Sequence, residues 1–502
     1  MKGHAWNPDV QQEQYIELQT KTGQAYDDSS MNIEQGYEAA GQMGKYHLLL
    51  ALSSAITMIS CMIYIFSVPL FLVNPQITCD RADCSDVCER GAKYTYVNKD
   101  FNFVSQFDLL CDSYSGTILE VAFGICSLLG CVVFSTLSDS VGRLPVLFLG
   151  ITGNVVCLSL IIMYPSYKYC VIISATLGFF IAALGTPTYA LLYDSVLSGY
   201  IAFYGTYLNV CFAFGEVIVG VVLWFGASWR TMCYFIIGWS SIFYLLLLGL
   251  REPPRFLLSK RREADALRNL QAIAKFNSKR LPENMALSAA GGGCVTEQAI
   301  AFSDTMKLIL QLSNFFRVIM CMFLFYTCGC VYYGISLNLQ RFPGNVYGNA
   351  IINGVVEIIA VMTSNYIMDA FGKRRAFILA FSLTGSFMTL QGFSADFPRL
   401  TTLNIAASKF GISAAFNLVY IMVGEMFPSA AKNTVLGICI ITERLGCASG
   451  PVLGVNPILF SVVASSLCFS SMLIACFMPI QAPAAKILPN PDEYTKGKPM
   501  LA

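Results

Sequence analysis

The stretch LLLALSSAITMISCMIYIFSVPLFLV, residues 48–73, decides the fold class of this chain. It contains no charged residue, and as a helix it is long enough to cross the roughly 30 Å hydrocarbon core of a bilayer. Apolar runs of this kind recur as far as Cys476. Because backbone polar groups inside a bilayer must pair with one another, each run is predicted to be a helix. The sequence therefore predicts an all-α membrane protein.

The overall composition agrees with this interpretation. The chain has 502 residues, of which 55% are hydrophobic and 13% are charged, whereas soluble domains carry about 25% charged residues. Its mean hydropathy is +0.59. A very apolar soluble protein is the disfavoured alternative. The net charge of +1 gives no electrostatic reason to expect a nucleic-acid partner. The polar start of the chain predicts no cleavable signal peptide.

The apolar runs divide into two sets of six, separated by a long polar connection. We predict a tail over 1–46, a first bundle over 47–250 with a loop at 74–114, a central loop over 251–314, a second bundle over 315–478 and a tail over 479–502. The predicted spans are 47–73, 115–137, 144–164, 170–193, 203–224, 229–250, 315–338, 347–369, 375–394, 401–424, 433–454 and 457–478.

The distribution of basic residues predicts the orientation. Cytoplasmic loops are enriched in Lys and Arg, and the segment 251–280 holds only three acids against nine bases, which are Arg251, Arg255, Lys260, Arg261, Arg262, Arg268, Lys275, Lys279 and Arg280. We expect this loop and both termini to be cytoplasmic and the loop 74–114 to be outside. The helical periodicity of 263–276 predicts a short amphipathic helix on the inner face.

Most of the 19 cysteines lie in apolar runs, where cysteine is a small packing residue. Four lie together in the loop 74–114: Cys79, Cys84, Cys88 and Cys111. Their spacing does not fit a zinc site, and the chain has only two histidines. We predict two disulfides on the non-cytoplasmic side, with three connectivities left open. No metal site is expected.

A short motif occurs once in each half. SDSVGR ends the second predicted span at residues 138–143, and MDAFGKRR ends the eighth at 368–375. Each places an acid at a helix end, then a glycine, then basic residues. Such groups can pair between helices in one conformation and separate in another. We therefore predict a conformational latch, and simple positive-inside anchoring is the alternative.

Four further segments resemble those of the organic cation, organic anion and carnitine transporter family within the major facilitator superfamily. They are DFNFVSQFDLLC (100–111), EPPRFLLSK (252–260), AAFNLVY (414–420) and GEMFP (424–428). The resemblance extends from about residue 47 to residue 480. It implies a latch formed by Asp139, Arg143, Asp369, Arg374, Asp194, Arg255 and Glu425.

The chain also departs from this family. Its outer loop has four cysteines where many members have six, and it has no Asn-x-Ser/Thr sequon. Asp194 stands where the family usually has Glu, and Ser198 lies where a base is usual. These departures predict a weaker latch in the first half and leave room for a member that does not transport.

Ionisable residues deep in a span indicate function, because they are costly to bury in lipid. Glu357 lies in the middle of the eighth span, within a Val-Glu-Ile segment that resembles cation and carnitine transporters. Glu216 aligns with a family position that often lines the pocket. Arg444 begins an Arg-Leu-Gly segment that resembles anion and carnitine members, and its guanidinium suits a carboxylate. Tyr332 and Tyr333 resemble the paired tyrosines of the family cavity. The alternatives are structural pairing and packing.

These residues predict a carrier with two six-helix bundles around a midplane cavity. Two acids and one arginine suit a zwitterion such as carnitine or betaine, and an organic cation or an organic anion is the alternative. A non-transporting membrane sensor or structural subunit is the alternative of a different class. We expect a plasma-membrane location, no enzyme activity and no cofactor, since no catalytic constellation is present. A coupling ion, sodium or proton, is left open.

Overall fold

The computed structural model describes residues 30–79, 88, 94–281, 286–287, 312–341, 344–394, 397–427 and 429–478. Within these ranges, twelve helices are long and apolar enough to cross a membrane. They follow the order of the twelve predicted spans, so the all-α membrane prediction is confirmed. The chain is a multi-pass membrane protein.

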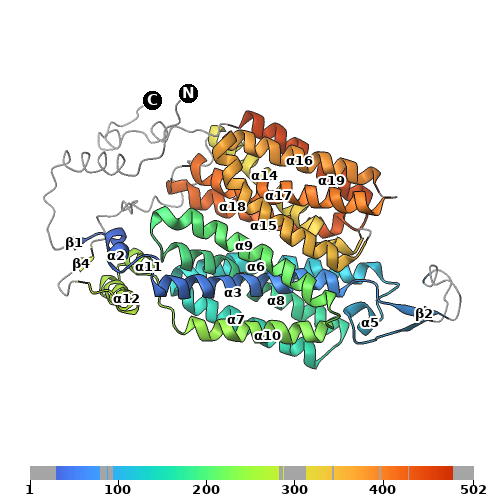
Figure 1. Cartoon of the computed structure of the whole chain (residues 1–502), viewed down its shortest axis with the longest axis horizontal. Coiled ribbons are helices and arrows are strands. Elements are labelled where there is room, and N and C mark those ends of the chain that lie inside the picture. Colours follow the sequence, from blue (N-terminus) through green and yellow to red (C-terminus); the bar gives the residue numbers. More distant parts are fainter. Residues whose placement is uncertain are drawn as a thin grey trace, which may run out of the picture.

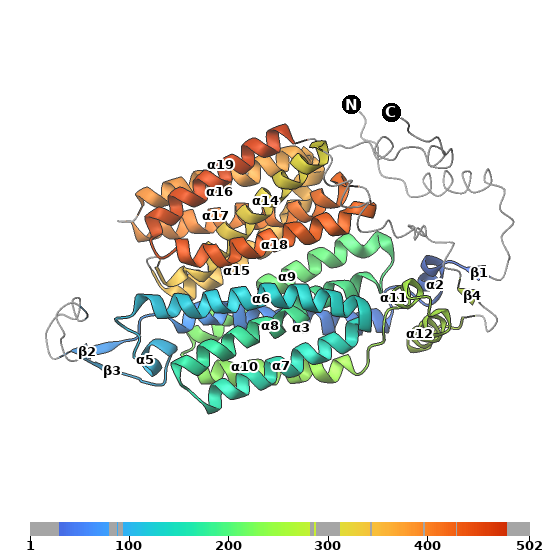
Figure 2. The same cartoon turned by 180° about the vertical axis from the view of Figure 1, so that it is seen from behind.

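The twelve long helices form two bundles of six, one from each half of the chain (Figures 1 and 2). The first bundle contains α3 (Lys45–Phe71), α6 (Ser113–Val141), α7 (Arg143–Met163), α8 (Tyr167–Tyr193), α9 (Ile201–Trp224) and α10 (Trp229–Leu247). The second contains α14 (Leu312–Leu337), α15 (Val346–Phe371), α16 (Lys373–Phe393), α17 (Pro398–Met426), α18 (Ser429–Leu453) and α19 (Pro457–Phe477). The short 3-10 helices are η1 (Ser198–Tyr200) and η2 (Leu339–Arg341).

The two bundles meet mainly through α9 against α15 and α6 against α18. Glycines allow the first pair to approach closely. A Cβ on Gly220 would lie 2.7 Å from Ile351 Cγ1, and a Cβ on Gly354 would lie 2.6 Å from Val217 Cγ2. Small residues at such contacts let helix backbones pack tightly in a membrane.

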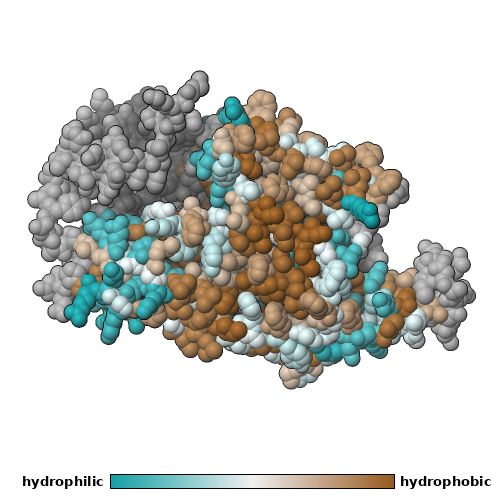
Figure 3. Space-filling model, viewed as in Figure 1, coloured by the Kyte–Doolittle hydropathy of each residue, from teal (hydrophilic) through white to brown (hydrophobic). Residues whose placement is uncertain are grey.

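The outer surface of the bundles is apolar. Large hydrophobic side chains such as Leu245 and Phe393 are 69% and 83% exposed. Figure 3 shows a broad hydrophobic region across the middle of both bundles, with hydrophilic side chains gathered toward the ends. This belt is the surface that a bilayer would cover.

One end of the molecule carries β2 (Ile77–Cys79), β3 (Tyr94–Tyr96) and α5 (Phe103–Phe107), and we call it the disulfide end (Figure 1). β2 and β3 pair in antiparallel register. Cys88 and Cys111 form a disulfide, and Cys79 is also disulfide-bonded. Cys84 lies outside the described residues. An ion pair of 2.9 Å between Arg230 and Asp100 ties this loop to α10.

The opposite end, which we call the basic end, carries α11 (Pro254–Ser259) and α12 (Glu263–Phe276). The bounds of α12 confirm the predicted helix at 263–276. The segment 1–46, predicted as a tail, includes β1 (Ser30–Met31), α2 (Ile33–Ala39) and the first two residues of α3. β1 pairs with β4 (Ala286–Leu287) in the central loop. The chain before α3 is therefore partly folded onto this end.

Candidate functional site

Three ionisable side chains meet between the two bundles, near the middle of their helices. Glu216 projects from α9, Glu357 from α15 and Lys409 from α17. Lys409 Nζ lies 2.9 Å from Glu357 Oε2 and 3.5 Å from Glu216 Oε2. The exposed fractions are 1% for Glu216, 4% for Glu357 and 0% for Lys409. The lysine and Glu357 belong to the second bundle, so the contact with Glu216 crosses between the halves.

Two residues of α14 complete this group. The Tyr332 hydroxyl donates to the Glu357 carboxylate, with its oxygen 2.8 and 2.7 Å from the two carboxylate oxygens. Lys409 Nζ donates to Ser336 Oγ at 2.5 Å and lies 3.5 Å from the centre of the Tyr332 ring. An ammonium over an aromatic face is attracted to the ring electrons. We call Glu216, Glu357, Lys409, Tyr332 and Ser336 the Lys409 cluster.

The two acids of this cluster are unequally satisfied. Glu357 has both Tyr332 and Lys409, whereas neither carboxylate oxygen of Glu216 accepts a hydrogen bond within the described part of the chain. Two carboxylates and one ammonium leave a formal charge of −1. Buried ions cost several kcal/mol each unless they are well paired. Glu216 is therefore the less closely paired of the two acids.

A second charged group lies on α18. Glu443 is 1% exposed and accepts a hydrogen bond from the Tyr420 hydroxyl. Arg444 Nη1 lies 3.7 Å from Glu443 Oε1, and the arginine side chain is 27% exposed. Adjacent helix positions project in different directions, but the long arginine side chain reaches back toward its neighbour. We call Glu443, Arg444 and Tyr420 the Arg444 cluster.

The paired tyrosines of α14 lie between these two clusters. The ring centres of Tyr332 and Tyr333 are 5.0 Å apart in an edge-to-face arrangement. Tyr332 belongs to the Lys409 cluster, and Tyr333 is an electrostatic neighbour of Arg444. Phe212 and Phe416 pack on Tyr332 at centroid distances of 6.2 and 5.4 Å. These aromatic side chains thus lie between the Lys409 cluster and Arg444.

Asparagines join the bundles on the basic-end side of the Lys409 cluster. Asn209 of α9 donates to Asn417 of α17 at 3.0 Å, and Asn417 donates to Asn365 of α15 at 3.1 Å. Asn365 in turn donates to Thr206 of α9 at 2.8 Å. We call Asn209, Asn365 and Asn417 the asparagine bridge. It links the halves with neutral hydrogen bonds, which can break without leaving a buried charge.

The residues predicted to form a latch in the first half lie together at the basic end. Arg143 pairs with Asp139 at 2.8 Å and with Asp194 at 3.1 Å, and its guanidinium lies 4.2 Å from the centre of the Phe256 ring. Glu252 accepts hydrogen bonds from two backbone amides at the start of α7. Burial raises the pKa of the Asp194 and Glu252 carboxyls, although Arg143 opposes this shift.

A helix from the start of the chain completes this region. Glu34 of α2 forms an ion pair with Arg255 and bonds to the amide and hydroxyl of Ser198 at 3.2 and 2.7 Å. The Tyr37 hydroxyl donates to the Asp194 carbonyl at 2.7 Å. The acid of α2 therefore contacts both Arg255 and the position where the family usually has a base.

The matching motif in the second half is arranged differently. Asp369 is exposed and forms no ion pair among the described residues. Arg374 Nη2 donates to the Met478 carbonyl at 2.8 Å. Both glycine turns have positive φ, 132° at Gly142 and 82° at Gly372, which glycine adopts without strain. The side chain of Glu425 lies outside the described part of the structure.

Comparison with known proteins identifies the family. Residues 50–364 match the sequence profile of the Major Facilitator Superfamily. The chain belongs to this superfamily. It is 28% identical to solute carrier family 22 member 15-like from Xenopus laevis, over 84% of this chain and 87% of that protein. It is 24% identical to organic cation/carnitine transporter 4 from Arabidopsis thaliana, over 82% and 81%. The resemblance to organic cation, organic anion and carnitine transporters is confirmed.

Solved structures agree with this major facilitator assignment. The xylose transporter XylE from E. coli, in an inward-open conformation, aligns with a TM-score of 0.59 at 14% identity. The alignment covers 86% of this chain and 96% of that structure. At this identity the likeness shows the fold, which is the predicted pair of six-helix bundles. The relatives named here are transporters.

This major facilitator chain places its five predicted binding residues in two neighbouring groups. Glu216, Glu357 and Tyr332 meet in the Lys409 cluster, whereas Arg444 and Tyr333 lie together on the other side. Glu357 and Arg444 do not pair with each other, because each has a closer partner of opposite charge. Lys409 itself was missed. It lies within the predicted span 401–424, so the rule that selected Glu357 would also have selected it.

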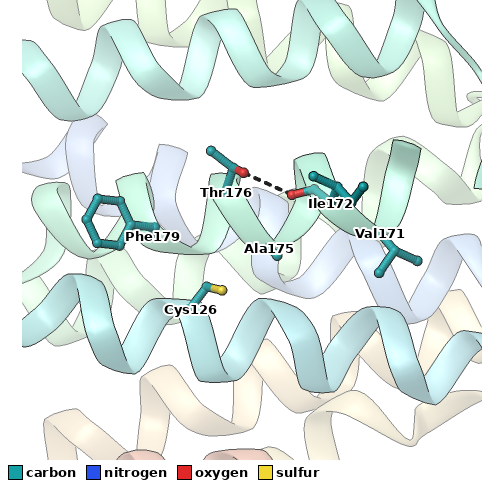
Figure 4. Close-up of a pocket in the computed structure, with 6 residues that line it drawn as sticks. All are labelled: Cys126, Val171, Ile172, Ala175, Thr176 and Phe179. Atoms are coloured by element: carbon teal, nitrogen blue, oxygen red, sulfur yellow. Dashed lines mark hydrogen bonds between the residues drawn. The ribbon is translucent and has the colours of Figure 1, made fainter. Parts of the chain in front are cut away.

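A separate hollow lies on the outside of this major facilitator fold, between α6 and α8. Its lining is apolar and includes a hydrogen bond from the Thr176 hydroxyl to the Ile172 carbonyl at 2.9 Å (Figure 4). The lining residues are Cys126, Val171, Ile172, Ala175, Thr176 and Phe179. Because this lining contains no charged side chain, it does not suit an organic ion.

Proposed function

We propose that this major facilitator protein is an alternating-access carrier of small organic ions in the plasma membrane, with a zwitterion such as carnitine or betaine as its favoured substrate. The relatives in solute carrier family 22 and the plant organic cation/carnitine transporter support this class of solute. The basic end would face the cytoplasm, because α11 and α12 carry the excess of Lys and Arg. Both termini then lie in the cytoplasm.

One observation carries the proposal: an acid-rich cluster and an arginine lie on either side of the Tyr332–Tyr333 pair between the bundles. The Lys409 cluster has a formal charge of −1, and its Glu216 accepts no hydrogen bond within the described residues. The Arg444 side chain is partly exposed, and its buried Nε has no hydrogen-bond partner among those residues. A zwitterion would place its cationic group at the first cluster and its carboxylate at the second.

The contacts between the bundles suit alternating access. The glycine contacts of α9 with α15 lie toward the disulfide end, and the asparagine bridge lies toward the basic end, with the Lys409 cluster between them. Opening either end requires only one of these two sets of contacts to separate. The binding residues can therefore face one side at a time as the bundles rock.

An organic cation is the second candidate substrate, because the net negative charge of the Lys409 cluster could bind one without Arg444. An organic anion would rely on Arg444 alone. Neither sodium nor proton coupling follows from these contacts, so transport with and without each ion gradient is part of the test. A sensor that binds solute without moving it would share the site and would fail to show flux.

The first prediction separates these substrates by charge. Purified protein in liposomes should take up labelled betaine, and Arg444→Gln should weaken betaine uptake at least tenfold, because losing a charge-assisted hydrogen bond costs about 1.5–3 kcal/mol. Betaine methyl ester, which keeps the cation and lacks the anion, should be affected much less. Glu357→Gln should show the opposite bias, impairing cations and sparing simple anions.

The matched control is Arg399→Gln, which removes an exposed arginine of α17 outside both clusters and should change neither substrate. If Arg444→Gln and Glu357→Gln reduce every substrate equally, both residues are structural. The zwitterion proposal would then be wrong. The broader proposal of an organic-ion carrier would still be supported by any organic-ion flux that the wild type shows.

A further inference from the structure

The ammonium of Lys409 occupies the surroundings that a substrate ammonium would need. It lies 2.9 Å from the Glu357 carboxylate, 3.5 Å from the centre of the Tyr332 ring and 6.0 Å from that of Phe66. A carboxylate with an aromatic face is a general binding arrangement for organic ammonium groups. In the structure this arrangement is filled by a side chain of the protein itself.

A second position for the same ammonium lies beside the first. Glu216 Oε2 is 3.5 Å from Lys409 Nζ, and both oxygens of Glu216 are without a hydrogen bond within the described residues. Glu216 is 1% exposed, so it lies away from bulk solvent. A small movement of the flexible lysine side chain would complete a charge-assisted hydrogen bond with this acid.

We propose that Lys409 is a tethered cation that passes from Glu357 to Glu216 when the cationic group of a substrate takes its place over Tyr332. This inference rests on the proposed function and deepens it. In this proposal the substrate cation binds to Glu357 and Tyr332, and the displaced lysine binds to Glu216. Lys409 thereby selects substrates that carry a single positive charge.

The exchange balances the buried charge. The empty cluster has two carboxylates and one ammonium, and the loaded cluster has two carboxylates and two cations, so its formal charge changes from −1 to zero. A neutral solute cannot replace Lys409 at Glu357, and a group with two positive charges would leave an excess. The cluster therefore selects solutes whose buried head carries one positive charge.

The exchange also couples binding to the contact between the bundles. The pair Lys409–Glu357 joins α17 to α15 within the second bundle, whereas Lys409–Glu216 joins α17 to α9 across the halves. Loading would thus replace an ion pair inside one bundle with a closer ion pair between bundles. The ligand stabilises the state in which the halves are joined because, in that state, it moves Lys409 closer to Glu216.

The test measures equilibrium binding of labelled tetramethylammonium to the purified full-length protein, together with its uptake into liposomes. Glu216→Gln removes the second position of the lysine, so affinity should fall at least tenfold. Lys409→Gln removes the competing cation, so affinity should stay equal or rise while maximal uptake falls. In the double variant Glu216→Gln, Lys409→Gln, affinity should recover to the wild-type level without recovery of uptake.

Glu120→Gln, which changes an acid of α6 outside the cluster, is the matched control and should alter neither quantity. Melting temperatures show whether each variant folds. Glu216→Gln keeps the Lys409–Glu357 pair intact. If the lysine variants do not fold, the tetramethylammonium affinity of Glu216→Gln decides the test by itself. Unchanged affinity in Glu216→Gln, or lost affinity in a folded Lys409→Gln, would overturn the tethered-cation proposal.

The proposed function fails in a different way. If the wild type binds and transports no cation, zwitterion or anion, then the carrier proposal is wrong. If the wild type transports cationic solutes but the double variant does not regain affinity, the carrier proposal stands and the exchange of Lys409 between the two acids is wrong.

Discussion

At the scale of single residues, Tyr332 combines two interactions that can be separated by mutation. Its hydroxyl donates to Glu357, and its ring lies under the ammonium of Lys409. The hydroxyl stabilises the carboxylate in the absence of substrate, and the ring offers a surface to any cation at that position. The residue therefore contributes both to the resting cluster and to binding.

Replacing Tyr332 by Phe should keep the ring and remove the hydrogen bond. Glu357 would then depend more strongly on Lys409, so we expect tetramethylammonium affinity to fall about tenfold. Tyr332→Leu should lose the ring as well and bind more weakly than Tyr332→Phe. The control is Tyr326→Phe, since Tyr326 lies on the same helix and its hydroxyl bonds to Ser449, outside the Lys409 cluster. Wild-type affinity in Tyr332→Phe would contradict this role for the hydroxyl.

Residue patterns predicted part of the site. Glu216, Glu357 and Arg444 could be selected because charged side chains in apolar spans are costly and stand out. Which charge pairs with which depends on how helices far apart in sequence pack together, as for Glu216 and Lys409. Pairing of Arg444 with a nearby acid was left as an alternative, because helix spacing gives the direction of Cβ and not the path of a long side chain.

At the scale of elements, α2 is tied to the first-half latch by its own side chains. Glu34 contacts Arg255 and Ser198, and Tyr37 contacts the carbonyl of Asp194. These bonds connect the start of the chain to the ends of α8 and α11. We infer that α2 stabilises one arrangement of the basic end and thereby influences the rate of conformational exchange.

Glu34→Gln should slow maximal uptake several-fold while leaving substrate affinity within about twofold, because the change lies far from the Lys409 cluster and weakens only a partly exposed ion pair. Initial uptake rates and equilibrium binding measure the two effects separately. Glu38→Gln alters an exposed acid of the same helix and should have no effect. A large loss of affinity in Glu34→Gln with an unchanged maximal rate would show that α2 acts on the binding site.

The long apolar elements could be predicted from sequence, and α2 could not. Each span has enough apolar residues to specify a membrane helix by itself, and the apolar stripe of α12 specifies its buried face. The seven-residue α2 has no such signal. Short helices are marginal in isolation, and this one is held by partners more than 150 positions away, such as Asp194 and Arg255.

At the scale of the whole molecule, the two bundles are joined at three successive levels. Close glycine contacts hold α9 against α15 toward the disulfide end, the Lys409 cluster crosses between the halves in the middle, and the asparagine bridge joins them toward the basic end. The ionic contact lies between two neutral ones. The charge of a bound substrate can therefore act on the ionic contact between the bundles while either of the neutral contacts breaks.

The central claim is that this protein moves a small organic ion across a membrane, and solute counterflow tests it most directly. Liposomes containing the purified wild type are loaded with a high concentration of unlabelled betaine and diluted into a low concentration of labelled betaine, and entry of the label is followed. We expect transient accumulation of label above the level reached in unloaded liposomes. Label entry equal to that of protein-free liposomes, for betaine and for a panel of cations and anions, would contradict the account.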